Sequence, residues 1–501
     1  MHIFLKGDCV KNNFFKNISY LVLSGFIVKI LGLFNKIILI RFLGLSGMSI
    51  YSLVMPTMML FVVAGELSLP QAVSKVVSEN IIIKPYSNRP ILIKMAKIAL
   101  AFSFFLILIL ISIAWPLSFY WLKNPDLLYP LLSIIPMIPI VPLTGILKGY
   151  FNGHKLMNIT SIASLVEQVF RIISSFILIN FFSKFNQSLA VCASIFTIAF
   201  GEASSLIYMI FKAKKITSLK INKSSVSVKP LTSIIVPSTL SRMTYSISNF
   251  FEPIVFTISL SKIGLSSRAI ASYYASINAF AIPILVLLSF VSLSISVAFL
   301  PHLSESSKKN DLNKFNLIVS SGLKLSLIPA ILITSILSFY PDTILSILYG
   351  TTSGSIYVRF MAPFFLLFYI ESIMHVALEV RGYASKIFYI NLLLSIIKLL
   401  SIYFLGIIPQ INAYSLAYST IINIVATSII YLLILMKDTH FRIKLYDFIK
   451  IFVLISLSYM SSFFLTKYFD SYVAIILSST SFIFFFIILY RKKEIKNLFK
   501  F

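Results

Sequence analysis

Charged residues are scarce in this 501-residue chain, and acidic residues are the scarcest. Only 12% of its residues are charged, 58% are hydrophobic and the mean hydropathy is +0.95. Soluble globular chains carry roughly 25% charged residues, so the composition excludes that class. The apolar residues form runs of about 20 or more, as a helix needs to cross a bilayer, without the alternation of a β-barrel. We predict an all-α polytopic membrane protein.

Motifs for catalysis are also missing. The sequence contains no glycine-rich phosphate loop, no zinc motif and no nucleophile elbow. The two cysteines, Cys9 and Cys192, are far apart and imply no disulfide framework. We therefore expect no enzymatic activity, no metal and no cofactor. If the protein transports a substrate uphill, we expect the energy to come from a source other than ATP.

The charge is strongly one-sided, with 43 Lys and Arg against 16 Asp and Glu. In a soluble protein this would suggest nucleic acid, but here the basic residues follow membrane topology, so we expect no nucleic-acid partner. With fourteen predicted spans, 31 basic residues fall on the N-terminal side, 5 on the opposite side and 7 inside spans. The predicted spans lie near 18–42, 46–70, 94–116, 127–147, 158–182, 187–211, 231–260, 270–300, 318–340, 356–380, 386–406, 412–436, 449–466 and 471–490.

This distribution predicts that both termini face the cytoplasm, in the cell membrane. The first apolar run follows a basic region and shows no small-residue cleavage site, so we interpret it as a retained span.

Three motifs recur along the chain at nearly constant offsets of 227, 231 and 233 residues. Pro56 recurs as Pro283, Leu69-Pro70 as Leu300-Pro301, and Lys148-Gly149-Tyr150 as Arg381-Gly382-Tyr383. The pattern indicates an internal duplication of six spans. Because six is even, both repeats have the same orientation and are expected to be related by an axis along the membrane normal. The predicted division is an N-terminal lobe (1–211), a basic cytoplasmic linker (212–230), a C-terminal lobe (231–436) and two further spans with a basic tail (437–501).

Ionisable residues inside spans are the candidate functional residues, because each costs at least ~2.5 kcal/mol at a helix centre unless it is paired or faces water. The first span carries Lys29 and Lys36, seven residues apart and on one face. The seventh carries Arg242 and, further along, Glu252. Fixed positive charge in a cleft suits an anionic substrate, particularly a pyrophosphate. The alternatives are that Lys29 pairs with Glu66 or that the long side chains reach the interface.

Two further groups have helical spacing. Glu167 and Arg171 lie at i and i+4, which predicts a structural ion pair within the fifth span. Glu371, His375 and Glu379 lie four residues apart on the tenth span, where they can line a cavity, couple an ion or proton, or form a network inside the bundle.

Several segments resemble, in order along the chain, those of the stage V sporulation protein B group. This group is a polysaccharide-biosynthesis branch of the multidrug/oligosaccharidyl-lipid/polysaccharide exporter superfamily. The segments are KILGLFNKIILIRFLG (29–44), LPQAVSKVVSEN (69–80), LKGYFNGH (147–154), EQVFRI (167–172), PSTLSR (237–242) and FLPHLSES (299–306).

The resemblance implies fourteen helices in two six-helix lobes around a cavity that opens alternately to either side. It also implies flipping of a lipid-linked glycan of the undecaprenyl-diphosphate type, with lipid II for spore cortex or cell wall peptidoglycan as the expected substrate. Lys29, Lys36 and Arg242 would hold the diphosphate. Membrane lipids and cell-wall synthesis enzymes are the expected partners.

The chain departs from the group where Gly65-Glu66-Leu67-Ser68-Leu69-Pro70 replaces the usual Gly-Ile-Pro. Glu66 can reduce the positive charge of the cavity or act as a gate. Two alternatives stay open: a cation-coupled multidrug exporter of the same superfamily, which would favour an acidic cavity, and a non-transporting membrane scaffold for envelope synthesis.

Overall fold

The computed structural model describes residues 4–83, 88–216, 229–287 and 289–490, and all regular structure within these ranges is helical. The chain divides into two compact units, residues 1–257 and 258–501. This boundary falls inside one long helix. The predicted linker (212–230) lies largely outside the described residues, so the predicted division into lobes stays a prediction.

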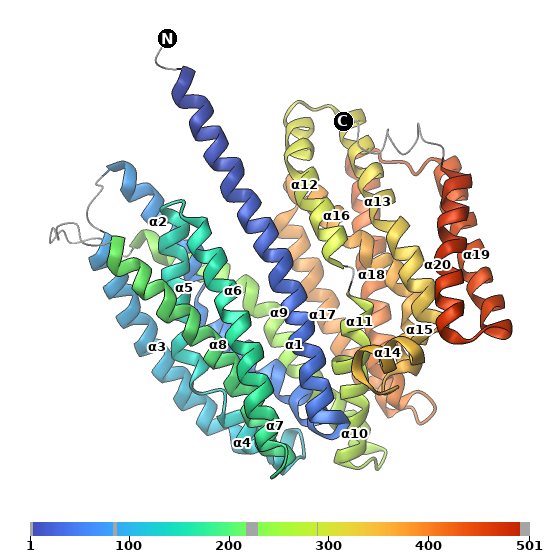
Figure 1. Ribbon diagram of the computed structural model, residues 1–501, viewed down its shortest axis with the longest axis horizontal. Helices are drawn as coiled ribbons and strands as arrows, with labels where there is room; N and C mark the ends of the chain where they lie inside the picture. The colour runs from blue at the N-terminus through green and yellow to red at the C-terminus, as the bar shows by residue number, and fades with distance from the viewer. Residues whose placement is uncertain (1–3, 84–87, 217–228, 288, 491–501) are drawn as a thin grey trace. The chain divides into compact units, whose positions relative to one another are not determined.

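The first unit is a helical bundle, shown in Figure 1 in blue through green. Within it, α2 packs against α5, while α8 packs against both α5 and α6. Its helices are α1 (Phe4–Glu66), α2 (Leu69–Ile83), α3 (Asn88–Pro116), α4 (Leu128–Leu132), α5 (Met137–Gly153), α6 (Met157–Ser174), α7 (Asn180–Phe182), α8 (Gln187–Ile216) and most of α9 (Lys229–Lys262).

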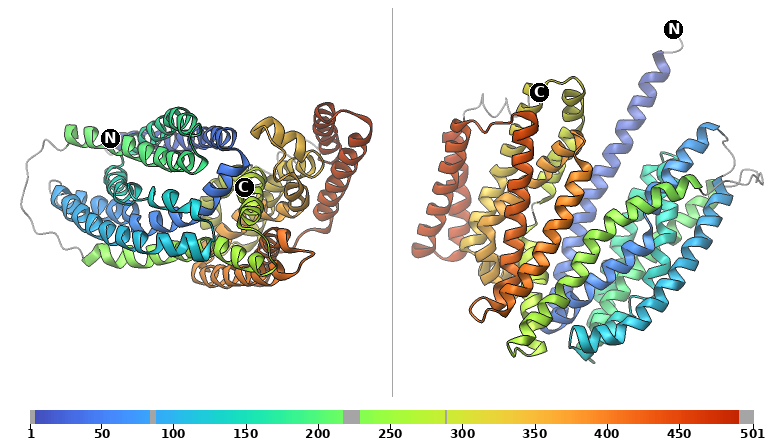
Figure 2. Two further views of the ribbon diagram at one scale, coloured as in Figure 1. Left: turned by 90° about the horizontal axis from the view of Figure 1, so that it is seen from below. Right: turned by 180° about the vertical axis from the view of Figure 1, so that it is seen from behind.

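The second unit is also a bundle, in which α16 packs against α12, α13 and α18, and the last two helices pack on each other. Figure 2 shows α19 and α20 side by side. The helices are α10 (Ser267–Ala275), α11 (Ile282–Leu285), α12 (Ser289–Lys308), α13 (Leu312–Phe339), α14 (Pro341–Tyr349), α15 (Ser355–Met361), α16 (Phe365–Val380), α17 (Ala384–Ile407), α18 (Ser415–Thr439), α19 (Leu445–Tyr468) and α20 (Ser471–Leu489).

Eleven helical stretches of the described chain are long and apolar enough to cross a membrane, or twelve if one bent pair is a single span. The polytopic all-α prediction is therefore confirmed, whereas the number fourteen and the orientation stay predictions. One of the stretches, Ile27–Ser78, has 52 residues, more than one crossing requires. It is interrupted at Gly44, whose φ of 59° and ψ of −168° are not helical, between the first two predicted spans.

The predicted span 270–300 is not one straight helix. It corresponds to Ser267–Leu285 and Ser289–Lys308, two helical stretches bent by 49° relative to each other. Pro283, the counterpart of Pro56, lies at the start of α11, close to this bend. Because proline lacks the N–H that a continuous helix needs, its place near the interruption is physically reasonable.

Candidate functional site

Close contact between α2 and α5 positions the residues of the candidate site. Gly145, Gly149 and Gly153 recur every fourth residue on α5, the spacing that lets two helices approach closely in a membrane. A Cβ added at Gly149 would lie 2.7 Å from the Pro70 carbonyl oxygen, and one at Gly153 would lie 2.7 Å from Val77 Cβ. Only glycine fits these positions without a shift of α2.

A single glycine brings α8 equally close to α6. A Cβ added at Gly201 would lie 2.8 Å from the carbonyl oxygen of Glu167 and 3.2 Å from Cβ of Arg171. Glu202, the next residue on α8, is thereby held beside the charged pair of α6. Lys148 likewise neighbours Gly149 at the α2–α5 contact.

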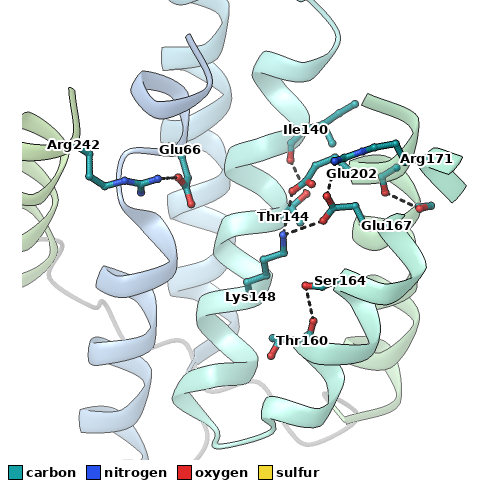
Figure 3. Close-up of polar contacts among 12 residues, drawn as sticks. Glu66, Ile140, Thr144, Lys148, Thr160, Ser164, Glu167, Arg171, Glu202 and Arg242 are labelled. Atoms are coloured by element: carbon teal, nitrogen blue, oxygen red, sulfur yellow. Dashed lines mark hydrogen bonds and ion pairs between the residues drawn. The ribbon is translucent and has the colours of Figure 1, made fainter. Parts of the chain in front are cut away.

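These contacts bring four charged side chains together from α5, α6 and α8 (Figure 3). Lys148 Nζ lies 3.3 Å from Glu202 Oε1 and 3.6 Å from Glu167 Oε2. Arg171 Nη2 donates to Glu167 Oε1 over 2.6 Å, so the pair that the i, i+4 spacing predicts is present. We call these four residues the Lys148 network.

The Lys148 network is largely screened from its surroundings. The exposed fraction of the side chains is 27% for Lys148, 10% for Glu202 and 12% for Glu167. Two cations and two carboxylates balance each other, which offsets the cost of removing each charge from water. The network therefore holds no excess charge with which to bind an ionic substrate.

A second ion pair lies where α1 ends and α2 begins. Leu67 and Ser68 have positive φ angles of 50° and 48°, and this turn interrupts the helix directly after Glu66. Arg242 on α9 donates to Glu66 Oε2 over 2.5 Å, as Figure 3 shows. Thr239, one turn earlier on α9, donates to the buried Ser68 hydroxyl over 3.4 Å.

The Glu66–Arg242 pair is more open than the Lys148 network, with 39% of the Arg242 side chain exposed. Glu66 also contacts α5, because its Cγ lies 3.7 Å from the position of a Cβ at Gly145. Among the described residues, Glu66 pairs with Arg242 and not with Lys29, the alternative considered above. Arg242 thus keeps an accessible face while one carboxylate neutralises it.

The other predicted cations lie on α1. Lys29 is exposed and forms no ion pair or hydrogen bond with the part of the chain that the structure describes. Lys36 is half-buried, and its Nζ lies 5.6 Å from the centre of the Tyr51 ring, within the range of a cation–π contact. Lys29 is therefore the more available of the two for an external anion.

The remaining predicted residues are dispersed. Glu252 is buried on α9. On α16, Glu371 accepts a hydrogen bond from Ser428 over 3.2 Å, and His375 Nδ1 lies 4.0 Å from Glu379 Oε2. Glu371 and His375 are half-buried whereas Glu379 is exposed, so the three do not share one environment.

Sequence reasoning missed the central role of Lys148 and the contribution of Glu202. The signals were present: Glu202 is an ionisable residue inside a predicted span, and the repeated Gly-x-x-x-Gly spacing marks a close helix contact. It also missed the pair in the second repeat, where Arg381 Nε lies 2.6 Å from Asp438 Oδ2 and Tyr383 donates to the same carboxylate over 2.9 Å. The hydrogen bond to Asp438 raises the pKa of Arg381.

Comparison with known proteins identifies the family. Residues 14–307, more than half of the chain, match the profile of the family described as "Polysaccharide biosynthesis protein". The chain belongs to this polysaccharide biosynthesis protein family. The resemblance noted from the sequence motifs is thereby confirmed.

Two curated relatives come from Bacillus subtilis (strain 168). The stage V sporulation protein B is 27% identical over 454 residues, which cover 89% of this chain and 88% of the relative. The sporulation protein YkvU is 25% identical over 414 residues, covering 79% and 88%. This member of the polysaccharide biosynthesis protein family thus aligns with both relatives over most of their length.

Solved structures share the fold. The lipid II flippase MurJ in an inward closed conformation matches with a TM-score of 0.68 and 18% identity, covering 95% of this chain and 99% of that one. An inward-facing multidrug resistance MATE family transporter of the MOP superfamily matches with a TM-score of 0.65 and 14% identity, covering 83% and 98%. The polysaccharide biosynthesis family member therefore has the fold of polytopic membrane transporters.

Proposed function

We propose that this protein flips a lipid-linked glycan precursor of the undecaprenyl-diphosphate type across the cytoplasmic membrane, with lipid II as the first candidate. Family membership and the shared fold support a transporter for polysaccharide biosynthesis. The observation that carries the proposal is the Glu66–Arg242 pair, in which a guanidinium with 39% of its side chain exposed pairs with a single carboxylate among the described residues.

A diphosphate is the ligand chemistry that suits this arrangement. Guanidinium binds phosphate oxygens in a planar, bidentate geometry, and a substrate diphosphate can replace the Glu66 carboxylate as the partner of Arg242. Lys29, exposed on α1, supplies a second cation. In this mechanism the headgroup sugar occupies aqueous space, the polyprenyl tail stays in lipid, and access alternates between the two sides of the membrane.

In this mechanism Glu66 acts as a gate, because it competes with the substrate for Arg242. Without substrate it neutralises Arg242, which keeps an unpaired cation out of a low-dielectric environment. With substrate, the diphosphate and Glu66 compete for the same guanidinium. Glu66 therefore weakens binding and speeds release, as a transporter that must let its substrate go requires.

A multidrug exporter is less well supported. The fold does not separate the two functions, because a multidrug transporter and a lipid II flippase match with similar TM-scores of 0.65 and 0.68. The charges favour the flippase: the Lys148 network carries no excess charge, whereas the Glu66–Arg242 pair and the exposed Lys29 together carry an excess of positive charge, which suits an anion better than a cationic drug.

The test is transfer of fluorescent lipid II across vesicles that contain the purified protein. Wild type is expected to transfer the lipid, and Lys29→Ala and Arg242→Ala are expected to lose at least about tenfold in rate, since each removes a charge-assisted contact. Lys184→Ala, which removes an exposed cation outside the candidate site, is the matched control. Glu66→Gln is expected to bind lipid II more tightly and release it more slowly.

Two results would count against this proposal. Equal rates for wild type and empty vesicles would exclude lipid II as the substrate under these conditions, and another lipid-linked glycan would be tested in its place. Transfer that is insensitive to both Lys29→Ala and Arg242→Ala would keep the function but reject the site. A scaffold would tolerate these substitutions and show no transfer of any lipid.

A further inference from the structure

A cavity of about 680 Å³ lies within the second unit and shares no lining residue with the candidate site of the first. Its walls come from the first turns of α13, the connection between α18 and α19, the start of α19 and the residue that follows α20. The cavity thus opens where several spanning helices begin or end, the level of lipid headgroups.

Four cations line this cavity: Lys324, Arg442, Lys444 and Lys450. Asp447 is the sole carboxylate among its described lining residues. Lys324 and Asp447 neutralise each other at 2.7 Å, and less than a fifth of either side chain is exposed. The other three cations leave the cavity with an excess of positive charge.

Two of these cations are available to a ligand. Arg442 and Lys444 are exposed and form no ion pair or hydrogen bond with the residues that the structure describes. Lys450 is placed by aromatic rings, with its Nζ 4.3 Å from the centre of the Tyr446 ring. Arg442 and Lys444 therefore line the cavity without a carboxylate partner among the described residues.

The start of α19 adds a further attraction for an anion. Lys444 is its N-cap residue and provides no side-chain hydrogen bond to the first turn. Tyr446 and Asp447, in that first turn, line the cavity. The backbone N–H groups at the beginning of this 24-residue helix carry partial positive charge and suit a phosphate group.

Exposed apolar side chains next to the cavity favour a lipid over a free ion as its ligand. Leu445, Phe448 and Phe452 on α19 are 72%, 55% and 60% exposed. They lie on a helix that is apolar and long enough to span the membrane, so they are expected to face acyl chains. A molecule with a phosphate group and hydrocarbon chains can occupy both surfaces at once, whereas inorganic phosphate can occupy only the cavity.

We propose that this cavity binds the phosphate of an anionic phospholipid headgroup, held by Arg442, Lys444 and the start of α19, while the acyl chains lie along the exposed face of α19. Basic pockets between membrane helices are a recognised setting for such headgroups. The site would make the last two helices responsive to the anionic lipid content of the membrane.

Native mass spectrometry of the full chain in detergent tests this proposal. The probes are dioleoylphosphatidylglycerol, dioleoylphosphatidylcholine and inorganic phosphate, each titrated separately. Arg442→Gln combined with Lys444→Gln is expected to weaken phosphatidylglycerol binding about 30-fold, because two cations near the phosphate are removed. Phosphatidylcholine binding is expected to stay unchanged.

The matched control is Lys386→Gln combined with Lys437→Gln, which removes two exposed cations near the start of α17 and the end of α18 that do not line the cavity. This control is expected to bind phosphatidylglycerol like wild type. Asp447→Asn is a second test with the opposite sign, since it increases the positive charge of the cavity and should tighten binding. This variant also decides the matter if the double variant does not fold.

The proposal is overturned if the double variant keeps wild-type affinity for phosphatidylglycerol, or if Asp447→Asn weakens it. Binding of inorganic phosphate that competes with phosphatidylglycerol for Arg442 and Lys444 would assign the cavity to a soluble anion and would equally overturn the lipid assignment.

Discussion

The two copies of the Lys/Arg-Gly-Tyr triplet have the same sequence pattern, but the glycine has a different structural role in each. In the first repeat, α5 continues beyond Gly149 to Gly153, and Gly149 is needed because its missing Cβ lets α2 approach. In the second, α16 ends at Val380, Gly382 has a φ of +84°, and a Cβ added at Gly382 would have no neighbouring atom within 4 Å. A glycine retained in both copies therefore meets a packing requirement in one and a backbone requirement in the other.

The charges of the triplets differ in the same way. Lys148 meets two carboxylates, and Arg171 completes its network. Arg381 meets one carboxylate, Asp438, which Tyr383 also contacts. In the first repeat the acidic partner, Glu202, lies inside the sixth predicted span, and in the second Asp438 lies two residues beyond the corresponding predicted span, near the end of α18. The first repeat adds a second, balanced pair on α6, whereas the positions 233 residues later, Leu400 and Phe404, are apolar and exposed.

The largest difference between the repeats is expected from removal of the cation. Lys148→Met leaves the mostly buried Glu202 without a cation and Glu167 with Arg171 alone, and an unpaired buried carboxylate typically costs about 3–5 kcal/mol. Arg381→Met leaves only Asp438, which keeps its hydrogen bond from Tyr383, so we expect about 1–3 kcal/mol. Loss of the monodisperse protein on heating in detergent, compared by size-exclusion chromatography, measures both. Equal losses would show that the extra carboxylate of the first repeat is without consequence.

Substitution of the two glycines should separate packing from backbone conformation. Gly149→Ala is expected to destabilise by about 1–3 kcal/mol because the added methyl overlaps the Pro70 carbonyl. Gly382→Ala should cost about 1 kcal/mol, since Cβ is disfavoured at positive φ.

Asparagine sharpens the test, because it enters the left-handed region more readily than alanine but is larger. Gly382→Asn should therefore be better tolerated than Gly382→Ala, while Gly149→Asn should be worse than Gly149→Ala. The same heating measurement applies. The reverse order at either position would contradict the assigned role of that glycine.

The smallest effect is expected when the first repeat is made to resemble the second. Glu167→Leu combined with Arg171→Leu removes a balanced pair and leaves Lys148 with Glu202, so stability should change by no more than about 1 kcal/mol. Glu167→Leu alone strands Arg171 and should cost about 3 kcal/mol. A double-mutant cycle on heat stability measures the coupling. A double variant as unstable as the single one would indicate that the pair has a further role.

Patterns within short stretches of sequence predicted features that involve neighbouring residues, such as helix interruptions and ion pairs within one helix. Run lengths placed an interruption between residues 42 and 46, where Gly44 leaves helical geometry, and the i, i+4 spacing predicted the contact between Glu167 and Arg171. The bend in the predicted span 270–300 was not predicted, because a long apolar run is compatible with either a straight or a broken helix. The roles proposed for Lys29, Lys36 and Arg242 stay predictions.

The class of the protein, its helical and membrane-spanning character, its motif repeats and its family resemblance could all be predicted from the sequence, since they follow from composition and from spacing along the chain. Which charged side chains form ion pairs across helices depends on the tertiary structure. Lys148 and Glu202 are 54 residues apart, and Glu66 and Arg242 are 176 residues apart. The packing of the helices at Gly149, at Gly201 and at the Leu67-Ser68 turn determines which residues become partners. The residues around one member of an ion pair do not indicate where along the chain the other member lies.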